Sequence, residues 1–281
     1  MLGADTIIAM ITLNGNTYKL CLIDTNAASE MVKYPDPVFR HFDEAMKPNK
    51  YIPCFSVFTI LELRHREDVY KRFLETFSIL PCFVLKSLDQ LFQDELNSYP
   101  DFTRVSPILV SSPGVLAPKN QKLADILNLA FSMPEIQELE NKWNSGKNST
   151  LDGILSHVKN YPPKGKKFTS EEIKSFVELA GFQQIAFRAR NFAQQIIKGG
   201  NPVVVDSFPS IKMTALIVFY KFYTDQRRPL ESDVFDIIIA ATLPYVDVVV
   251  TEKHQAEVLK KVKQQDKFIE NLEVLRLKDL Q

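Results

Sequence analysis

Short apolar runs that end at polar residues occur near both ends of the chain. The run YKLCLI at 18–23 ends at Asp24, and similar runs occupy 51–54, 246–250 and 272–277. The segments between them carry apolar residues three and four positions apart, a spacing typical of amphipathic helices. Strands that alternate with helices in this way predict an α/β fold.

The expected helices of the two terminal parts follow these strands. Ser56 is placed to cap the helix VFTILELRHR, and the continuation EDVYKRFLETF keeps the helical spacing. Pro81 interrupts that pattern, and CFVLK after it predicts a strand or an edge segment. Other helices are expected from Ala27, from Asp36 through Met46, over 210–223, over DVFDIIIAATL after a capping Ser232, and over 254–263.

The middle of the chain has a different pattern, because its helical segments are separated by stretches rich in Pro, Gly, Ser and Asn. We expect a mainly helical insertion at 87–205, which divides one α/β domain into the parts 1–86 and 206–281. A separate helical domain would give the same pattern. The expected helices are LDQLFQDEL, KLADILNLAF, PEIQELENKW and 170–198.

The composition, with 45% hydrophobic and 24% charged residues, is ordinary for a soluble globular protein. The 281 residues carry 34 basic and 34 acidic side chains, so the net charge is zero. Proteins that coat nucleic acid by charge alone are usually basic, so nucleic-acid binding here must be local. The chain shows neither a signal-peptide pattern nor an apolar run long enough to cross a bilayer, so we expect no membrane partner.

Three cysteines, Cys21, Cys54 and Cys82, lie beside apolar runs and have no metal-ligand spacing. Their odd number leaves one of them unpaired in any disulfide scheme. We therefore expect reduced and buried cysteines in a cytoplasmic protein.

Asp24 follows its apolar strand directly, and Asn26 lies two positions further on. If the chain stays extended there, both side chains point the same way. Sites of parallel sheets form outside the carboxyl ends of the strands, which makes this a suitable place for a catalytic acid. Taken alone, the pair fits turn residues that end a strand and cap the next helix better than it fits a catalytic site.

Further acids stand at the ends of other expected elements. Glu62 lies in an otherwise apolar helical run, where it either faces solvent or belongs to a site. Asp233 and Asp236 are three apart, so both project from one helical face, and Asp233 could equally be a capping residue. Thr251 and Glu252 follow the next apolar strand at its carboxyl end.

These acids would repel one another if the fold gathers them, and proteins tolerate such clusters mainly when a cation neutralises the charge. Hard oxygen ligands without matching Cys or His favour Mg²⁺ or Mn²⁺ over zinc. One or two such ions can activate a water molecule and stabilise the leaving oxygen of a phosphodiester.

The segments LIDTN at 22–26, the helix that carries Glu62, and DIIIAATLPYVDVVVTEK at 236–253 together resemble the PIN domain family. That family shows an apolar strand ending in Asp with Asn two later, a Glu on an early helix, an Asp before an Ile-Ala-Ala-like helix, and a strand ending in Thr. The resemblance covers the two terminal parts and leaves the middle outside. It implies an α/β/α sandwich with a central parallel sheet, and hydrolysis of RNA by one or two divalent ions.

The resemblance also implies roles for individual residues. Asp233 would be an extra carboxylate, and Asn26 and Thr251 would support the site by hydrogen bonding. The metal-binding carboxylates would be Asp24, Glu62, Asp236 and Glu252.

The chain departs from the family pattern at one acid. Many members have an Asp two positions after the Thr, where this chain has Lys253, and only Glu252 is acidic there. Glu252 can substitute through its longer side chain, or the site works with three acids and Asp233. A weakened or inactive enzyme is the other interpretation.

Basic residues near the acids are candidates for binding the RNA backbone. Arg64 and Arg66 come just after Glu62, and Arg227 and Arg228 precede the helix that carries the two aspartates. Short basic clusters are also typical of solvated surfaces.

We therefore expect a PIN-like endoribonuclease that uses Mg²⁺ or Mn²⁺ and has RNA as its substrate. A domain of this kind that acts as a toxin needs a protein inhibitor or antitoxin as its partner, and the sequence leaves oligomer formation open. One alternative is a non-catalytic PIN-like protein that binds RNA or protein. Another is a phosphatase with Asp24 as nucleophile, although that chemistry commonly has a second acid where Asn26 stands.

Overall fold

The fold is described from a computed structural model of the chain. The helix expected from Asp36 lies outside the described residues apart from position 44, and Arg227 also lies outside them. The described residues are 11–13, 16–33, 44, 50–101, 105–112, 123–141, 145, 154–155, 158–159, 167–200, 205–224 and 228–280.

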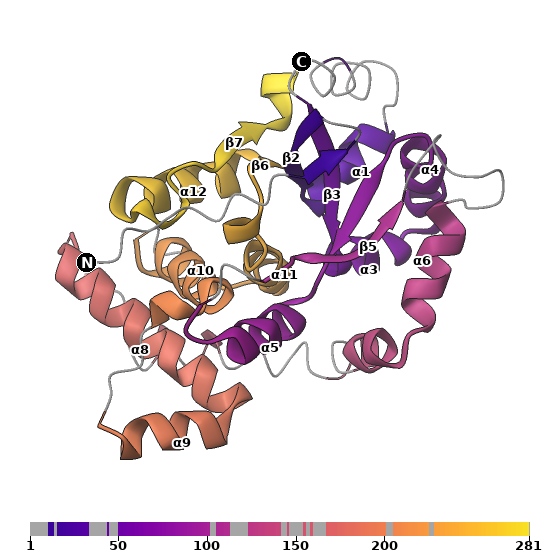
Figure 1. The fold of residues 1–281 in the computed structure, drawn as a ribbon. Coiled ribbons are helices and arrows are strands. Elements are labelled where there is room, and N and C mark those ends of the chain that lie inside the picture. Colours follow the sequence, from indigo (N-terminus) through magenta and orange to yellow (C-terminus); the bar gives the residue numbers. More distant parts are fainter. Residues whose placement is uncertain are drawn as a thin grey trace.

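A mostly parallel sheet of six strands occupies the centre of the protein, in the order β5-β4-β3-β2-β6-β7 (Figure 1). The expected α/β fold is therefore confirmed. Only the edge strand β5 runs antiparallel to its neighbour within this order, and β1 (Ile11–Leu13) pairs antiparallel with β2 outside it. The six strands are β2 (Asn16–Ile23), β3 (Tyr51–Ser56), β4 (Cys82–Leu85), β5 (Ile108–Ser112), β6 (Val248–Thr251) and β7 (Glu273–Arg276).

The register of the central strands decides which residues meet at the carboxyl edge. In β2, Leu22 lies between Cys54 of β3 and Val249 of β6, and both pairings are parallel. The ladder continues one residue past β2, where the Asp24 N–H donates to the carbonyl oxygen of Val250 at 3.1 Å. The residues that follow β2, β3 and β6 therefore emerge side by side.

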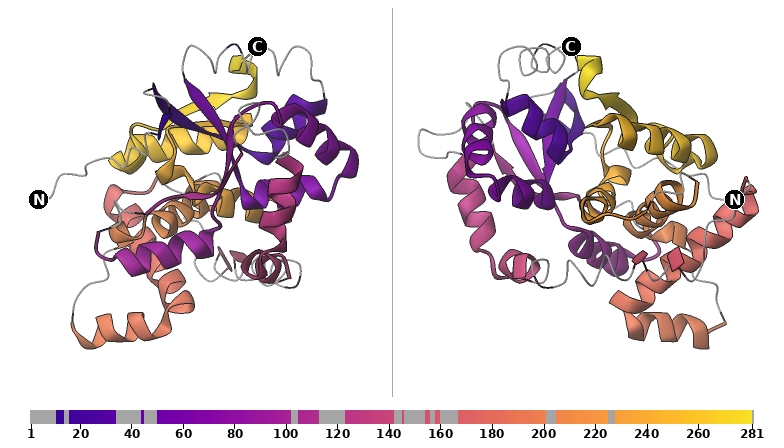
Figure 2. Two further views of the ribbon diagram at one scale, coloured as in Figure 1. Left: turned by 45° about the vertical axis from the view of Figure 1, so that its right-hand side comes forward. Right: turned by 180° about the vertical axis from the view of Figure 1, so that it is seen from behind.

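Helices cover both faces of the sheet, as the two views in Figure 2 show. Helices α1, α3 and α4 contact one another in one group, and α10 contacts α5, α8 and α12 in the other. The helices are α1 (Thr25–Lys33), α3 (Val57–Arg64), α4 (Glu67–Phe77), α5 (Leu88–Ser98), α6 (Leu123–Ser132), α8 (Ser170–Arg188), α9 (Arg190–Lys198), α10 (Pro209–Val218), α11 (Glu231–Ala240) and α12 (Lys253–Gln265).

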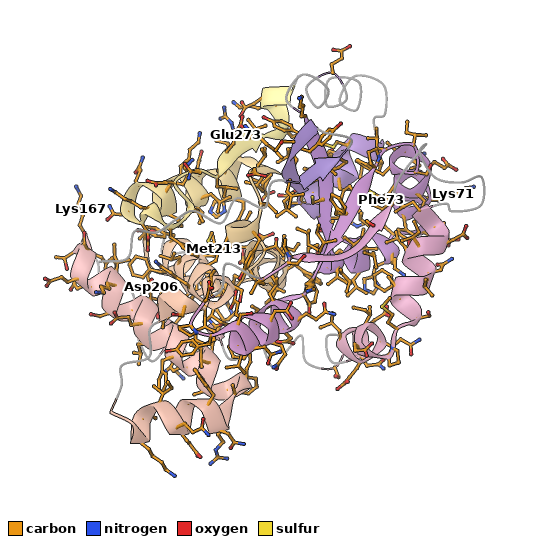
Figure 3. The ribbon with its side chains drawn as sticks, in the orientation of Figure 1. Lys71, Phe73, Lys167, Asp206, Met213 and Glu273 are labelled. Carbon is orange, nitrogen blue, oxygen red and sulfur yellow. The ribbon has the colours of Figure 1, made fainter. Side chains whose placement is uncertain are left out.

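Aromatic and aliphatic side chains fill the space between the sheet and these helices. Phe55 of β3 meets Phe73 and Phe77 of α4 edge-on, with ring centroids 4.9 and 4.8 Å apart. Figure 3 shows Phe73 on the side of α4 that faces the sheet. Burying each such side chain stabilises the fold by roughly 2–3 kcal/mol. All three cysteines are free and buried, as expected.

Local hydrogen bonds decide where the helices begin, and they confirm one of the predicted caps and contradict another. Ser56 does cap α3, because its hydroxyl accepts from the Phe58 N–H at 3.3 Å. The cap expected at Ser232 is wrong, since α11 begins at Glu231 and the Asp233 carboxylate accepts from the Leu230 N–H at 2.8 Å. Asp233 therefore takes the capping role considered for it.

Two expected long helices are interrupted. The segment 170–198 forms α8 and α9, which meet at the non-helical residue Ala189. The segment 210–223 forms α10 followed by a π-helical turn, η5 (Phe219–Thr224). Turns of this type insert an extra residue into the helical ladder and frequently occur at functional sites.

The mainly helical middle of the chain is joined to the rest of the fold. It contributes β5 to the sheet, and its helices α5 and α8 pack against α10. At the start of α8, Lys167 extends away from the body of the protein (Figure 3). Among the described residues, no helix is long and apolar enough to cross a membrane.

Candidate active site

Asp24 stands at the carboxyl end of the central strand β2, where donors from two directions fix its carboxylate. Its Oδ1 accepts from the Ala27 N–H in the first turn of α1 at 2.7 Å. Its Oδ2 accepts from the Thr251 hydroxyl and, at 3.3 Å, from the Glu252 N–H. Thr251 is the last residue of β6 and is fully buried, so the end of β6 holds the acid at the end of β2.

The environment of Asp24 favours its protonated form. The pKa of Asp24 is raised from 3.8 to about 6, mainly by burial and to a smaller extent by the nearby negative charge of Asp236. The hydrogen bonds from Thr251, Ala27 and Glu252 lower the pKa and only partly offset burial. A carboxyl group whose pKa is raised by burial and by a second acid is typical of a functional site.

Glu62 is joined to the same place through α1. It lies half-buried in α3, and the hydroxyl of Thr25 donates to its Oε2 at 2.5 Å. Thr25 directly follows Asp24 in the chain, so the first turn of α1 holds both acids. Helices α1 and α3 also pack against each other, which fixes this arrangement.

Glu252 lies on the solvent side of the site. The Asn26 side-chain amide donates to its Oε2 at 3.2 Å, so both of these predicted residues are brought to the site. The extended chain that would point Asp24 and Asn26 the same way is absent, because α1 begins at Thr25. Asn26 is helical, and its side chain reaches across to the residue after β6.

Asp233 and Asp236 share a cationic partner that the sequence analysis missed. The Lys221 Nζ lies 3.1 Å from Asp233 Oδ1 and 2.5 Å from Asp236 Oδ2. Lys221 is fully buried in η5, and the side chain of Asp233 is 1% exposed against 28% for Asp236. The signal in the sequence was one lysine inside the apolar run ALIVFYKFYT.

The oxygen donors of the site suit a hard divalent cation, and they limit the number of such ions that the site can hold. No three His, Cys, Asp or Glu side chains of the described residues are grouped so that they could hold a metal ion. Mg²⁺, however, keeps several waters and usually binds through one or two carboxylates together with substrate phosphates. Asp24 and Asp236 interact electrostatically and supply two such carboxylates. The residues therefore fit one Mg²⁺ or Mn²⁺.

The predicted RNA-binding arginines are less well placed. Arg64 pairs with Glu140 at 3.6 Å, and its guanidinium lies 4.5 Å from the centre of the Phe131 ring. Arg66 and Arg228 are exposed, on the loops before α4 and α11. Lys253, at the position where the chain departs from the family pattern, is 76% exposed and lies 4.0 Å from Glu257, one turn further along α12.

A second buried acid, Glu95, lies in α5 and was also missed. Its Oε1 accepts from the Ser210 N–H at 2.8 Å and from the Tyr245 hydroxyl at 2.5 Å, and its Oε2 accepts from the Ser210 hydroxyl at 2.8 Å. Burial raises the pKa of Glu95 to about 7. The pKa of Tyr245 is raised by burial and by the charge of Glu95, so the phenol keeps its proton and donates.

Comparisons with known proteins give no additional evidence about the function of the chain. No protein-family model, no curated protein and no solved structure matches the chain. The geometry at the ends of β2 and β6 and the motifs in the sequence are therefore the grounds for a functional proposal.

Proposed function

We propose that this protein is a divalent-metal-dependent endoribonuclease with a PIN-like arrangement of its site. The observation that carries the proposal is the pair Asp24 and Asp236. These carboxylates come from different elements, at the carboxyl end of the central strand and on α11, and the charge of Asp236 raises the pKa of Asp24. Two acids whose charges act on each other in this way favour binding of a cation.

Asp24 and Asp236 would hold one Mg²⁺ or Mn²⁺, with Glu62 and Glu252 at the two sides of the site. A bound ion supplies a more acidic water and a positive charge for the leaving oxygen of a phosphodiester. Thr251 and Ala27 hold the Asp24 carboxylate in place through their hydrogen bonds. Thr25 does the same for Glu62, which would accept a proton from a water molecule.

RNA as the substrate rests on the motifs that resemble PIN domains. The net charge of zero agrees with a site whose attraction for a phosphate backbone is local. The exposed Arg66 and Arg228 remain the candidates to contact phosphates at the rim. Because Arg64 is engaged with Glu140 and Phe131, we assign it to packing between α3 and the middle of the chain.

The test is cleavage of a labelled single-stranded RNA by the purified full-length protein with Mn²⁺ or Mg²⁺, and with EDTA in parallel. The variant Asp24→Asn/Asp236→Asn removes the two carboxylate charges, and Glu95→Gln alters a buried acid outside the site. We expect cleavage in the wild type and in Glu95→Gln, and none in the double variant or in EDTA. Equal cleavage by the double variant would contradict the proposal.

A non-catalytic binding protein is the second candidate, and one observation favours it. The ammonium of Lys221 already neutralises charge on Asp233 and Asp236, so part of the demand for a metal ion is met internally. This candidate predicts RNA or protein binding that does not depend on Mn²⁺ and no cleavage under any metal condition.

A further inference from the structure

Lys221 is the cation that the structure places inside the candidate site. Its side chain is fully buried, and its ammonium contacts two carboxylates of one helix, Asp233 and Asp236. It emerges from the π-helical turn η5, which redirects the chain after α10. The charge thus comes from a local irregularity of a kind that is frequent at functional sites.

Burial of the Lys221 ammonium costs free energy unless Asp233 and Asp236 both stay charged and close to it. An isolated buried charge costs several kcal/mol, and well-packed apolar residues often replace a buried ion pair without loss of stability. The contacts at 2.5 and 3.1 Å meet the requirement for Lys221. Stability alone therefore does not explain why a lysine stands here.

Asp236 has two different neighbours, which suggests an explanation. One of its oxygens contacts Lys221, and its charge also acts on Asp24, which belongs to the sheet edge. In sites with two metal ions, the cations lie roughly 3.5–4 Å apart and clamp the attacking and leaving oxygens together. Asp236 has the Lys221 ammonium on one side and the carboxyl group of Asp24 on the other.

We propose that the Lys221 ammonium takes the place of a second divalent cation, so that the site accepts one metal ion between Asp24 and Asp236. This inference rests on the proposed function. Lys221 acts as a positioning residue: it neutralises Asp233, orients Asp236 and repels a second cation from this side of the site. Removing the ammonium would leave two carboxylates three positions apart on α11, a pair suited to another hard cation.

The experiment counts Mn²⁺ ions bound to the full-length chain by titration calorimetry and by electron paramagnetic resonance. The variants are Lys221→Met, which removes the charge, and Lys221→Met/Asp233→Asn, which removes the newly exposed acid as well. We expect one Mn²⁺ in the wild type, two spin-coupled Mn²⁺ in Lys221→Met, and one in the double variant. Thermal unfolding with and without Mn²⁺ should show a larger rise in Tm for Lys221→Met than for the wild type.

The outcomes separate this inference from the nuclease proposal. One Mn²⁺ in both the wild type and Lys221→Met overturns the inference and leaves the nuclease proposal intact, and two in the wild type also overturns it. No Mn²⁺ bound to the wild type removes the metal-dependent nuclease and the inference together with it.

A folding defect is also informative. Lys221→Gln, which keeps hydrogen-bond donors, is the second variant in case Lys221→Met does not fold. If a cation from solution can replace the ammonium, either variant should fold in Mn²⁺ even when it is unfolded without it. Failure of both variants to fold at saturating Mn²⁺ overturns the inference.

Discussion

Glu95 in α5 and Asp24 after β2 are both acids whose pKa is raised by burial, to about 7 and about 6. Glu95 is completely buried, and neutral donors from Ser210 and Tyr245 occupy its oxygens. Asp24 is half-buried, lies at the end of a sheet strand and stands near a second acid, Asp236.

The difference between these two regions separates a structural acid from a catalytic candidate. The hydrogen bonds of Glu95 connect α5 to α10 and to the turn before β6, and its side chain is completely buried, out of reach of a ligand in solution. Asp24 is also hydrogen-bonded, but its neighbours add negative charge at a place that solvent can reach. A raised pKa alone would have given the two acids equal rank, and access from solvent distinguishes them.

The largest expected effect is on catalysis. Asp24→Asn or Asp236→Asn should lower the rate of RNA cleavage by at least about 100-fold, because even outer-shell partners of metal ligands typically contribute 10–100-fold. Glu95→Gln should change the rate by less than about threefold. Initial rates at saturating Mn²⁺ provide the measurement, and a comparable loss in Glu95→Gln would break the comparison.

For stability we expect the opposite order, with the larger effect at Glu95 and the smaller effect at Asp24. Glu95→Ala leaves the Ser210 N–H and the hydroxyls of Ser210 and Tyr245 without their buried acceptor, and we expect a loss of roughly 3–5 kcal/mol in the free energy of unfolding. Asp24→Ala should change it by about 1 kcal/mol or less, since the penalty of burying the charge disappears together with the hydrogen bonds. Urea denaturation measures both values, and a larger loss in Asp24→Ala would contradict the account.

Asp24 and Glu95 should also differ in the pH range over which each affects the free energy of unfolding. A carboxyl group with a raised folded-state pKa binds its proton more tightly when folded, so stability falls as pH rises from the unfolded to the folded pKa. For Asp24 this window runs from 3.8 to about 6, and for Glu95 from 4.5 to about 7. Asp24→Asn and Glu95→Gln should each remove their own window from the pH profile of unfolding.

Mg²⁺ sharpens this prediction because it competes with the proton at Asp24 and not at Glu95. Saturating Mg²⁺ should abolish the pH dependence that Asp24 contributes and leave the contribution of Glu95 unchanged. The apparent affinity for Mg²⁺ should correspondingly fall by about tenfold for each pH unit below 6. An affinity that stays constant over this range would count against Asp24 as a ligand.

The smallest effects concern the residues that support the acids. Thr25→Val keeps the shape of the side chain and removes the hydrogen bond to Glu62, so we expect about a tenfold loss of activity. Lys253→Ala, at the first residue of α12, is the control, and should change activity by less than about twofold because its side chain is exposed. Equal losses in both variants would show a general effect rather than one transmitted through Glu62.

The sequence predicted much of the sheet and part of the candidate site for identifiable physical reasons. Buried strands require continuous apolar runs, so β2, β3, β4 and β6 were visible, and the half-buried β7 was visible from the pattern LEVLRL at 272–277. The register of the parallel sheet then brings Asp24 next to Thr251. The edge strand β5 was missed, because its residues are mostly half-buried and lie within a mainly helical region.

Lys221 and Glu95 could not be assigned from local pattern because their partners are distant in the chain. Lys221 meets Asp233 across 12 positions, and Glu95 meets Ser210 and Tyr245 across 115 and 150. The only local signal for Lys221 was a single charged residue in an apolar helical run, and Glu95 had no such signal because Asp89 and Asp94 lie in the same helix. The helical position of Asn26 was missed for a related reason, since the Ala27 N–H finds its acceptor in Asp24 and allows α1 to start at once.

The most direct test of the difference between the two acids is a calorimetric Mn²⁺ titration of the wild type, Asp24→Asn and Glu95→Gln at neutral pH, which needs no knowledge of the RNA target. The account predicts that the wild type and Glu95→Gln bind one Mn²⁺ with the same affinity and that Asp24→Asn binds it at least about 100-fold more weakly. Equal binding by all three proteins, or none by the wild type, would contradict the assignment of Asp24 to a metal-dependent site.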